Sequence, residues 1–161
     1  MRHLFILLLV LFTNAFAFAQ TTFENEINAS VKAIEQKMIT WRRHLHANPE
    51  LSNREFKTME FIVQELSGLG LAIEKGAAKT GVIALLDTGK PGPVVGLRAD
   101  IDALPVKERV NIDFASKVET SYEGKTVGVM HACGHDAHTA ILLATAHVMT
   151  KHKNLFTGKI V

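Results

Sequence analysis

The sequence predicts an α/β fold in which a mixed sheet is flanked by helices. Over residues 27–46, apolar residues recur at steps of three and four, which is the spacing of one face of an amphipathic helix. Two short apolar runs, at residues 81–86 and 93–97, are typical of buried strands instead. The five-residue turn at residues 88–92, between these runs, is rich in glycine and proline and predicts a hairpin, so the sheet should be mixed.

The composition indicates a globular chain. It has 161 residues, which is enough to bury the core of one domain, with 47% hydrophobic and 21% charged residues. The formal net charge is only +2, and the basic residues are scattered along the chain rather than clustered. We therefore expect no nucleic-acid partner, because such proteins gather lysine and arginine on one face.

Residues 1–19 have the form of a secretory signal peptide. Arg2 gives a short positive start, residues 4–12 are an unbroken apolar run, and Ala17-Phe18-Ala19 offers a small-x-small cleavage site before Gln20. This pattern predicts export, periplasmic or secreted, with no stable membrane span after cleavage. An uncleaved anchor is the alternative for the same segment. The folded domain is then expected to be residues 20–161.

In the first half of that domain, proline, glycine and capping residues indicate where helices begin and end. Pro49 should end the first helix, because the residue before a proline disfavours helical backbone. Ser52 and Glu55 have the spacing of a capping box for a second helix, which Gly70 should end. A short strand over residues 71–74 then precedes the first of the two buried strands.

The second half is less regular at first. Residues 106–125 are polar and have little periodicity, which predicts a loop with a short edge strand. A helix is expected over residues 140–151, with Asp136 or Thr139 as its cap. Residues 158–161 have the character of another strand.

Two carboxylates follow directly on a buried strand. Asp100 and Asp102 come just after the run at residues 93–97 and are two positions apart. At the end of a strand they should lie near one another at the rim of the sheet. A solvated loop is the plainer reading of the same residues, because aspartate is mostly exposed.

A second cluster of reactive side chains lies between a predicted strand at residues 126–130 and the helix predicted over residues 140–151. Residues 129–139 hold three of the eight histidines and the only cysteine of the chain. In Cys133-Gly134-His135 the glycine allows a tight turn, so thiolate and imidazole can converge on one ion. These ligand types suit Zn²⁺ or a similar divalent metal. In an exported protein, binding a metal would also protect the lone thiolate.

Three motifs in this order resemble those of the M20 metallopeptidases, and within them of the amidohydrolase branch. That branch includes hippurate hydrolases, auxin-conjugate hydrolases and N-acyl-amino-acid deacylases. The resemblance covers about residues 27–161. The motifs are Trp41-Arg42-Arg43-His44-Leu45-His46 with Pro49-Glu50-Leu51-Ser52, Leu97-Arg98-Ala99-Asp100-Ile101-Asp102-Ala103-Leu104-Pro105, and Met130-His131-Ala132-Cys133-Gly134-His135-Asp136-Ala137-His138-Thr139.

The resemblance implies roles for particular residues. Cys133 and His135 would be ligands in a site that holds two divalent ions, Zn²⁺ or Mn²⁺, when complete. Asp102 matches the acidic residue that supports the catalytic centre. The residues expected around the ligands or facing the substrate are Asp100, His131, Asp136 and His138.

The resemblance also implies a larger enzyme. Members of the family have a glutamate pair, further ligand histidines and a lid domain that often dimerises, all later in the chain than Val161. Residues 20–161 are therefore expected to be the N-terminal portion of the catalytic domain, without the lid. We expect this portion to be inactive alone and the full-length form to be a homodimer.

The predicted function is metal-dependent hydrolysis of the amide bond of N-acyl amino acids or related small amides by a metal-activated water. Within the same family, an exopeptidase acting on small peptides or a diamino-acid deacetylase is the alternative. A non-catalytic metal-binding remnant and a thiol enzyme, with Cys133 as nucleophile and His135 as base, are alternatives of other classes.

Overall fold

The computed structural model describes the backbone of residues 2–161 and the side chains of residues 23–161. The chain forms two compact units, Met1–Ile34 and Glu35–Val161. Helix α1 (Arg2–Ala47) contributes to both and begins well before the predicted start at residue 27. The predicted signal peptide lies in the part of α1 whose side chains are outside the described residues. Across the described residues, no helix is both long and apolar enough to cross a membrane.

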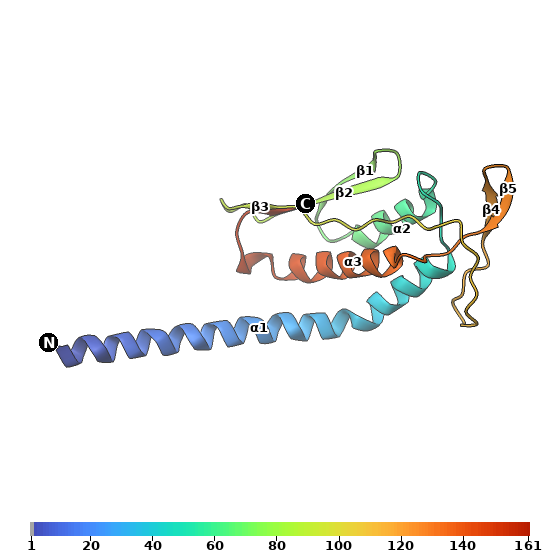
Figure 1. The fold of residues 1–161 in the computed structure, drawn as a ribbon. Coiled ribbons are helices and arrows are strands. Elements are labelled where there is room, and N and C mark those ends of the chain that lie inside the picture. Colours follow the sequence, from blue (N-terminus) through green and yellow to red (C-terminus); the bar gives the residue numbers. More distant parts are fainter. Residues whose placement is uncertain (1) are drawn as a thin grey trace. The chain divides into compact units, whose positions relative to one another are not determined.

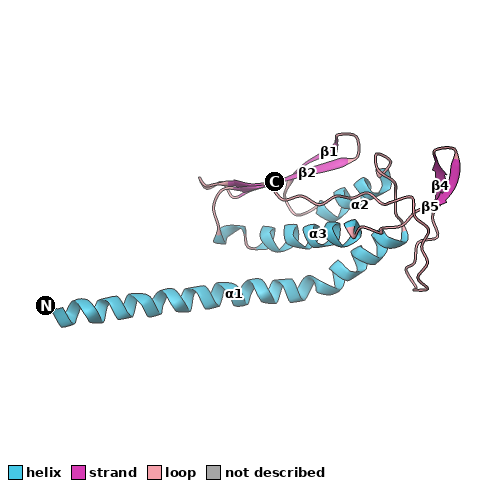
Figure 2. Ribbon diagram, viewed as in Figure 1, coloured by secondary structure: helices cyan, strands magenta, loops and turns pink. Residues whose placement is uncertain are grey.

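The second unit combines helices with a four-stranded mixed sheet, which confirms the predicted α/β class (Figure 1). The sheet order is β1-β2-β6-β3. Helix α2 packs on β1 and β2 and beside α3, so α2 and α3 lie on the same side of the sheet (Figure 2). The element bounds are α2 (Phe56–Leu66), β1 (Ala72–Ala77), β2 (Gly81–Asp87), β3 (Val94–Val95), β4 (Glu119–Tyr122), β5 (Lys125–Gly128), α3 (His135–Lys151), η1 (Lys153–Leu155) and β6 (Lys159–Ile160).

The predicted hairpin between the two buried strands is wrong. Strand β6 lies between β2 and β3, antiparallel to β2 and parallel to β3. The turn after β2 therefore carries the chain past one strand position instead of back onto its neighbour. Gly158, with φ +85°, leads into β6 at a point where a Cβ would overlap the carbonyl oxygen of Pro93. The close approach of two backbones at Gly158 lets the last strand enter between the others.

The start of α2 is stabilised by a residue outside the predicted capping box. Glu55 occupies the N-cap position but makes no side-chain cap hydrogen bond. The carboxylate of Glu50 instead accepts hydrogen bonds from the backbone N–H groups of Lys57 at 3.3 Å and Thr58 at 2.8 Å. Glu55 accepts the hydroxyl of Thr80 at 2.7 Å, which ties the helix to the start of β2. The helix ends at Leu66, four residues before the predicted stop.

A small core joins the segments that carry the candidate site. Leu51, Ala103 and Val129 are buried together, and Val118 packs against them. Two isolated bridges extend this contact: Leu51 pairs with Ala103, and Leu104 pairs with Met130. Strands β4 and β5 pair antiparallel and are the short strands near this core, in a stretch that is otherwise irregular.

Candidate metal centre

The two clusters singled out in the sequence meet in the structure. Leu104 donates its backbone N–H to the carbonyl of Met130 at 3.0 Å, and Met130 donates to Leu104 at 3.1 Å. This bridge follows Asp102 by two residues and precedes Cys133 by three. It brings the acidic segment against the turn that leads into α3.

His135 and Asp102 make the central contact. The Nδ1 atom of His135 lies 2.9 Å from the Oδ1 atom of Asp102 and 3.0 Å from its backbone oxygen. Both partners are acceptors, so Nδ1 carries the proton and donates. In a neutral ring this leaves the lone pair on Nε2, the nitrogen available to a metal. A carboxylate behind the far nitrogen of a ligand histidine is the usual support of such a ligand.

Asp100 lies on the other side of the same ring. Its Oδ2 atom is 4.0 Å from Nε2 of His135, and its Oδ1 atom pairs with Nη2 of Arg98 at 2.8 Å. The hydroxyl of Thr139 donates to the backbone oxygen of Asp100 at 3.1 Å, which holds the segment against α3. A carboxylate oxygen and an imidazole nitrogen therefore face one region from two segments of the chain.

Cys133 reaches the same turn through Gly134. The cysteine is a free thiol with an exposed side chain, and Gly134 has a left-handed backbone with φ +86°. Helix α3 begins at the next residue, His135, without a side-chain cap, so the predictions of Asp136 and Thr139 as caps are wrong. Both lie inside the helix and are buried.

The donor types fit a borderline-soft divalent ion, since one thiol, one imidazole and one carboxylate are all ligands of Zn²⁺. The set is nonetheless partial. Within the part of the chain that the structure describes, no group of three or more His, Cys, Asp or Glu side chains lies together closely enough to hold an ion. The residues present fit one side of a metal site.

His131 is a buried imidazole close to this centre. Its side chain is buried, and within the described residues neither ring nitrogen makes a hydrogen bond. Burial is the main reason that the pKa of His131 lies below its ordinary value, although the charge of Asp136 opposes the effect. The ring is therefore neutral at pH 7. His138 is exposed, and its ring centre lies 6.0 Å from that of His135.

Asp136 belongs to a buried charged group that could not be predicted as a group from the sequence. Its Oδ2 atom accepts Nε of Arg42 at 2.9 Å and lies 2.8 Å from Nδ1 of His46. The other ring nitrogen of His46, Nε2, lies 2.8 Å from Oε2 of Glu108. Nothing in the sequence around Glu108 indicates that it contacts His46, because Glu108 lies in an irregular polar stretch. Arg42 and His46 lie in the first family motif and Asp136 in the third, so these motifs were the available signal.

Both carboxyl groups of this cluster are stabilised in their charged forms. Burial alone would raise the pKa of Asp136, but the hydrogen bond with His46 and the charge of Arg42 outweigh it and lower the pKa. Burial likewise opposes ionisation of Glu108, and the hydrogen bond with His46 lowers its pKa below the ordinary value. The cluster therefore holds two carboxylates at neutral pH.

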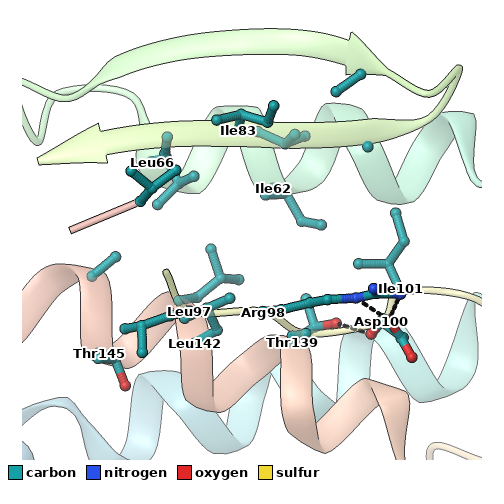
Figure 3. Close-up of a pocket in the computed structure, with 18 of the residues that line it drawn as sticks. Ile62, Leu66, Ile83, Leu97, Arg98, Asp100, Ile101, Thr139, Leu142 and Thr145 are labelled. Carbon is teal, nitrogen blue, oxygen red and sulfur yellow. Dashed lines mark hydrogen bonds and ion pairs between the residues drawn. The ribbon is translucent and has the colours of Figure 1, made fainter. Parts of the chain in front are cut away.

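A cavity of about 980 Å³ lies between the sheet and the helices. Figure 3 shows Ile62, Leu66 and Ile83 on one side of it, with Leu97 and Leu142 opposite. Asp100 and Asp102 border one end, but Cys133 and His135 do not line it. The cavity is thus a gap between two apolar layers, and one end of it borders the two aspartates of the candidate metal centre.

Comparison with known proteins connects this geometry to a family. Residues 96–161 match the model of peptidase family M20/M25/M40. The chain is 43% identical over 136 residues to thermostable carboxypeptidase 2 of Saccharolobus solfataricus, which covers 84% of this chain and 33% of that protein. It is 44% identical over 137 residues to an N-acyl-L-amino acid amidohydrolase of Geobacillus stearothermophilus, covering 85% of this chain and 35% of that protein.

A solved structure supports the same relationship. A dinuclear metal-binding peptidase of the M20 family from Bacillus subtilis superposes with a TM-score of 0.71 at 42% identity. The match covers 80% of this chain and 34% of that one. The chain thus spans about a third of the length of the curated relatives it matches.

Proposed function

Since the chain belongs to peptidase family M20/M25/M40, we propose that the protein is a metal-dependent hydrolase that cleaves the amide bond of N-acyl amino acids. The observation that carries the proposal is the contact between His135 and Asp102, at 2.9 Å. It directs Nε2 of the ring away from its carboxylate partner, beside a segment that ends in an exposed thiol. This is the arrangement that a metal-ligand histidine requires.

In this proposal each residue has one task. Cys133 and His135 hold a divalent ion, Zn²⁺ or Mn²⁺, in a site for two such ions. Asp102 keeps the His135 ring in the correct tautomer and balances the charge of the ion. Asp100, held by Arg98, adds negative charge on the open side of the ring. The ion supplies a Lewis acid and a bound water whose pKa is lowered to about 7.

The substrate class rests on the relatives. The relative from Geobacillus is an N-acyl-L-amino acid amidohydrolase, and another, at 44% identity, is an N-acetyl-L-cysteine deacetylase of Bacillus subtilis. The second candidate is removal of a C-terminal residue from small peptides. It is supported by two relatives of similar identity, the thermostable carboxypeptidases 1 and 2 of Saccharolobus solfataricus. Both reactions hydrolyse an amide beside a carboxylate, so one metal-bound water could serve either.

Residues 1–161 by themselves are proposed not to turn over substrate. The described residues bring together fewer than three metal-ligating side chains, and a site short of ligands binds an ion weakly. The ion would then activate water poorly. Export and a homodimeric active form complete the proposal; the first rests on the sequence of residues 1–19 and the second on the resemblance.

A metal-dependence assay with a substrate panel tests the function. The natural protein is stripped with a chelator, reloaded with Zn²⁺ or Mn²⁺, and assayed on N-acetyl, N-benzoyl and dipeptide derivatives of the same amino acids. We expect turnover to return with the metal and to favour N-acyl amino acids over dipeptides. Preference for dipeptides would support the carboxypeptidase candidate, and full activity after chelation would reject the metal mechanism.

A further inference from the structure

The buried charged cluster lies directly behind the candidate metal centre. Arg42 and His46 are four residues apart on α1, so they share one face of the helix, and both reach Oδ2 of Asp136. Asp136 follows His135 directly in the first turn of α3. The end of α1 is therefore tied to the turn that carries a candidate metal ligand.

His46 is the centre of this cluster. Its side chain is 7% exposed, while those of its two partners, Asp136 and Glu108, are 1% and 4% exposed. Each ring nitrogen lies 2.8 Å from a carboxylate oxygen. The ring of His46 thus lies between two carboxylates from different segments, and Arg42 adds a positive charge beside Asp136.

The contact between His46 and Asp136 anchors the first turn of α3 from the side of α1. The helix follows a left-handed glycine and has no side-chain cap, so its first turn lacks the usual local anchor. Asp136 is the acidic residue of that turn, and its negative charge interacts favourably with the dipole at the N-terminus of the helix. His46 in turn fixes Glu108, which belongs to the irregular stretch after the acidic segment. One imidazole thus connects three segments around the site.

We propose that His46 is a positioning residue for the candidate metal centre. Clamped between Asp136 and Glu108, it fixes the first turn of α3 and so keeps the His135 ring on Asp102, with Nε2 directed to the ion. His46 touches neither metal nor substrate in this role. The inference deepens the proposed function and rests on it for the assignment of His135 as a ligand.

The test compares His46→Gln with His44→Gln in the natural protein. His44 is exposed on the same helix, stacks on Phe61 and takes no part in the cluster, so it is the matched control. Titration with Co²⁺ is followed by the thiolate-to-cobalt absorption, which reports an ion bound at Cys133. Nitrogen-15 shifts of the metal-free protein report the tautomer of His135, assigned with His135→Gln.

For His46→Gln we expect Co²⁺ to bind about 10–100-fold more weakly, the range for loss of a group that orients a ligand. The Nδ1–H tautomer of His135 should give way to a mixture, and kcat should fall more than KM changes. His44→Gln should match the natural protein in all three. If His46→Gln does not fold, Glu108→Gln, which keeps the contact to Asp136, should show a smaller shift in the same direction.

A folded His46→Gln with natural Co²⁺ affinity and an unchanged His135 tautomer would overturn the proposal and leave His46 a structural residue. The same holds for Glu108→Gln where it replaces that variant. The tautomer readout needs neither metal nor turnover. A natural protein that hydrolyses no amide would therefore refute the proposed function and still allow this inference to be decided.

Discussion

The imidazole of His135 donates from Nδ1 to the carboxylate of Asp102, 2.9 Å away, and to the backbone oxygen of the same residue, 3.0 Å away. Two acceptors from one residue fix both the tautomer and the plane of the ring. The two residues are 33 positions apart, so the contact depends on the bridge between Leu104 and Met130. Backbone pairing therefore positions the two residues of the centre against each other.

Asp102→Asn should weaken metal binding about 10–100-fold, because the amide keeps the shape of the carboxylate but removes its charge. Catalytic turnover should fall at least as far. Isothermal titration with Zn²⁺ and a steady-state assay measure the two effects. Asp113→Asn, at an exposed position in the irregular stretch, is the matched control and should change neither. Equal metal affinity for both variants would make Asp102 an ordinary rim carboxylate.

Cys133→Ser should lose metal and activity together, since a hydroxyl is a far poorer ligand than a thiolate for a borderline-soft ion. The metal content of the purified variant, measured by inductively coupled plasma mass spectrometry, checks this. Ala132→Ser, which adds a hydroxyl at the neighbouring exposed position, should keep its metal. Activity of Cys133→Ser with a full complement of metal would reduce Cys133 to a free thiol.

Glu108→Gln should lower the free energy of unfolding at pH 7 by about 1.5–3 kcal/mol, the range for a hydrogen bond between charged groups. The pKa of Glu108 is lower in the folded protein than its ordinary value of 4.5, so the contribution is complete above that pH. It is lost as the pH falls through the lower, folded value. Urea unfolding of the natural protein and the variant should therefore give curves that converge in acid, and a constant difference would contradict the assignment.

Local features of the sequence predicted the helices and strands better than they predicted which strands pair. The bounds of β2 and the presence of α2, α3 and the last strand followed from short-range periodicity, since these patterns report burial on one face. The pairing of β2 with β3 did not follow, because a turn rich in glycine and proline looks the same whether the chain returns as a neighbour or skips a position. Only the close approach at Gly158, which comes 71 residues after the end of β2 at Asp87, decides between them.

Gly158→Ala should destabilise the second unit strongly. A Cβ there would overlap the backbone of Pro93, and φ +85° is itself strained for alanine. Thermal unfolding followed by circular dichroism should show a lower Tm. Gly96→Ala is the matched control, because no atom lies within 4 Å of its added Cβ. Similar Tm values for the two variants would mean that the backbones can separate at little cost.

The exported protein should begin at or near Gln20. The positive start, the apolar run and Ala17-Phe18-Ala19 predict cleavage directly after Ala19. Intact mass spectrometry of the protein recovered from its native compartment checks the site. Replacing Ala17 and Ala19 by leucine should block processing, while the same change at Ala29 should not. An intact Met1 in the exported protein would contradict the prediction.

The sequence singled out Cys133, His135 and Asp102, but not the charged cluster that lies behind them. Cys133 and His135 stand out by their residue types and by the glycine between them, and their role as metal ligands stays a prediction. Glu108 acquires its role only by being buried against His46, 62 positions earlier. A charged residue in a polar stretch carries no local sign of such a partner, because the pairing is created by the fold.

The place of β6 between β2 and β3 also constrains the order in which the chain can fold. On the ribosome, β2 and β3 emerge first, yet neither finds its shared neighbour until Lys159 and Ile160 have been synthesised. Until then the apolar residues Val94 and Val95 stand on a strand with no partner, and the facing edge of β2 is open as well. During synthesis, two strand edges thus stay unpaired until β6 has been made. A chaperone that binds unpaired strands could protect the nascent domain at this stage.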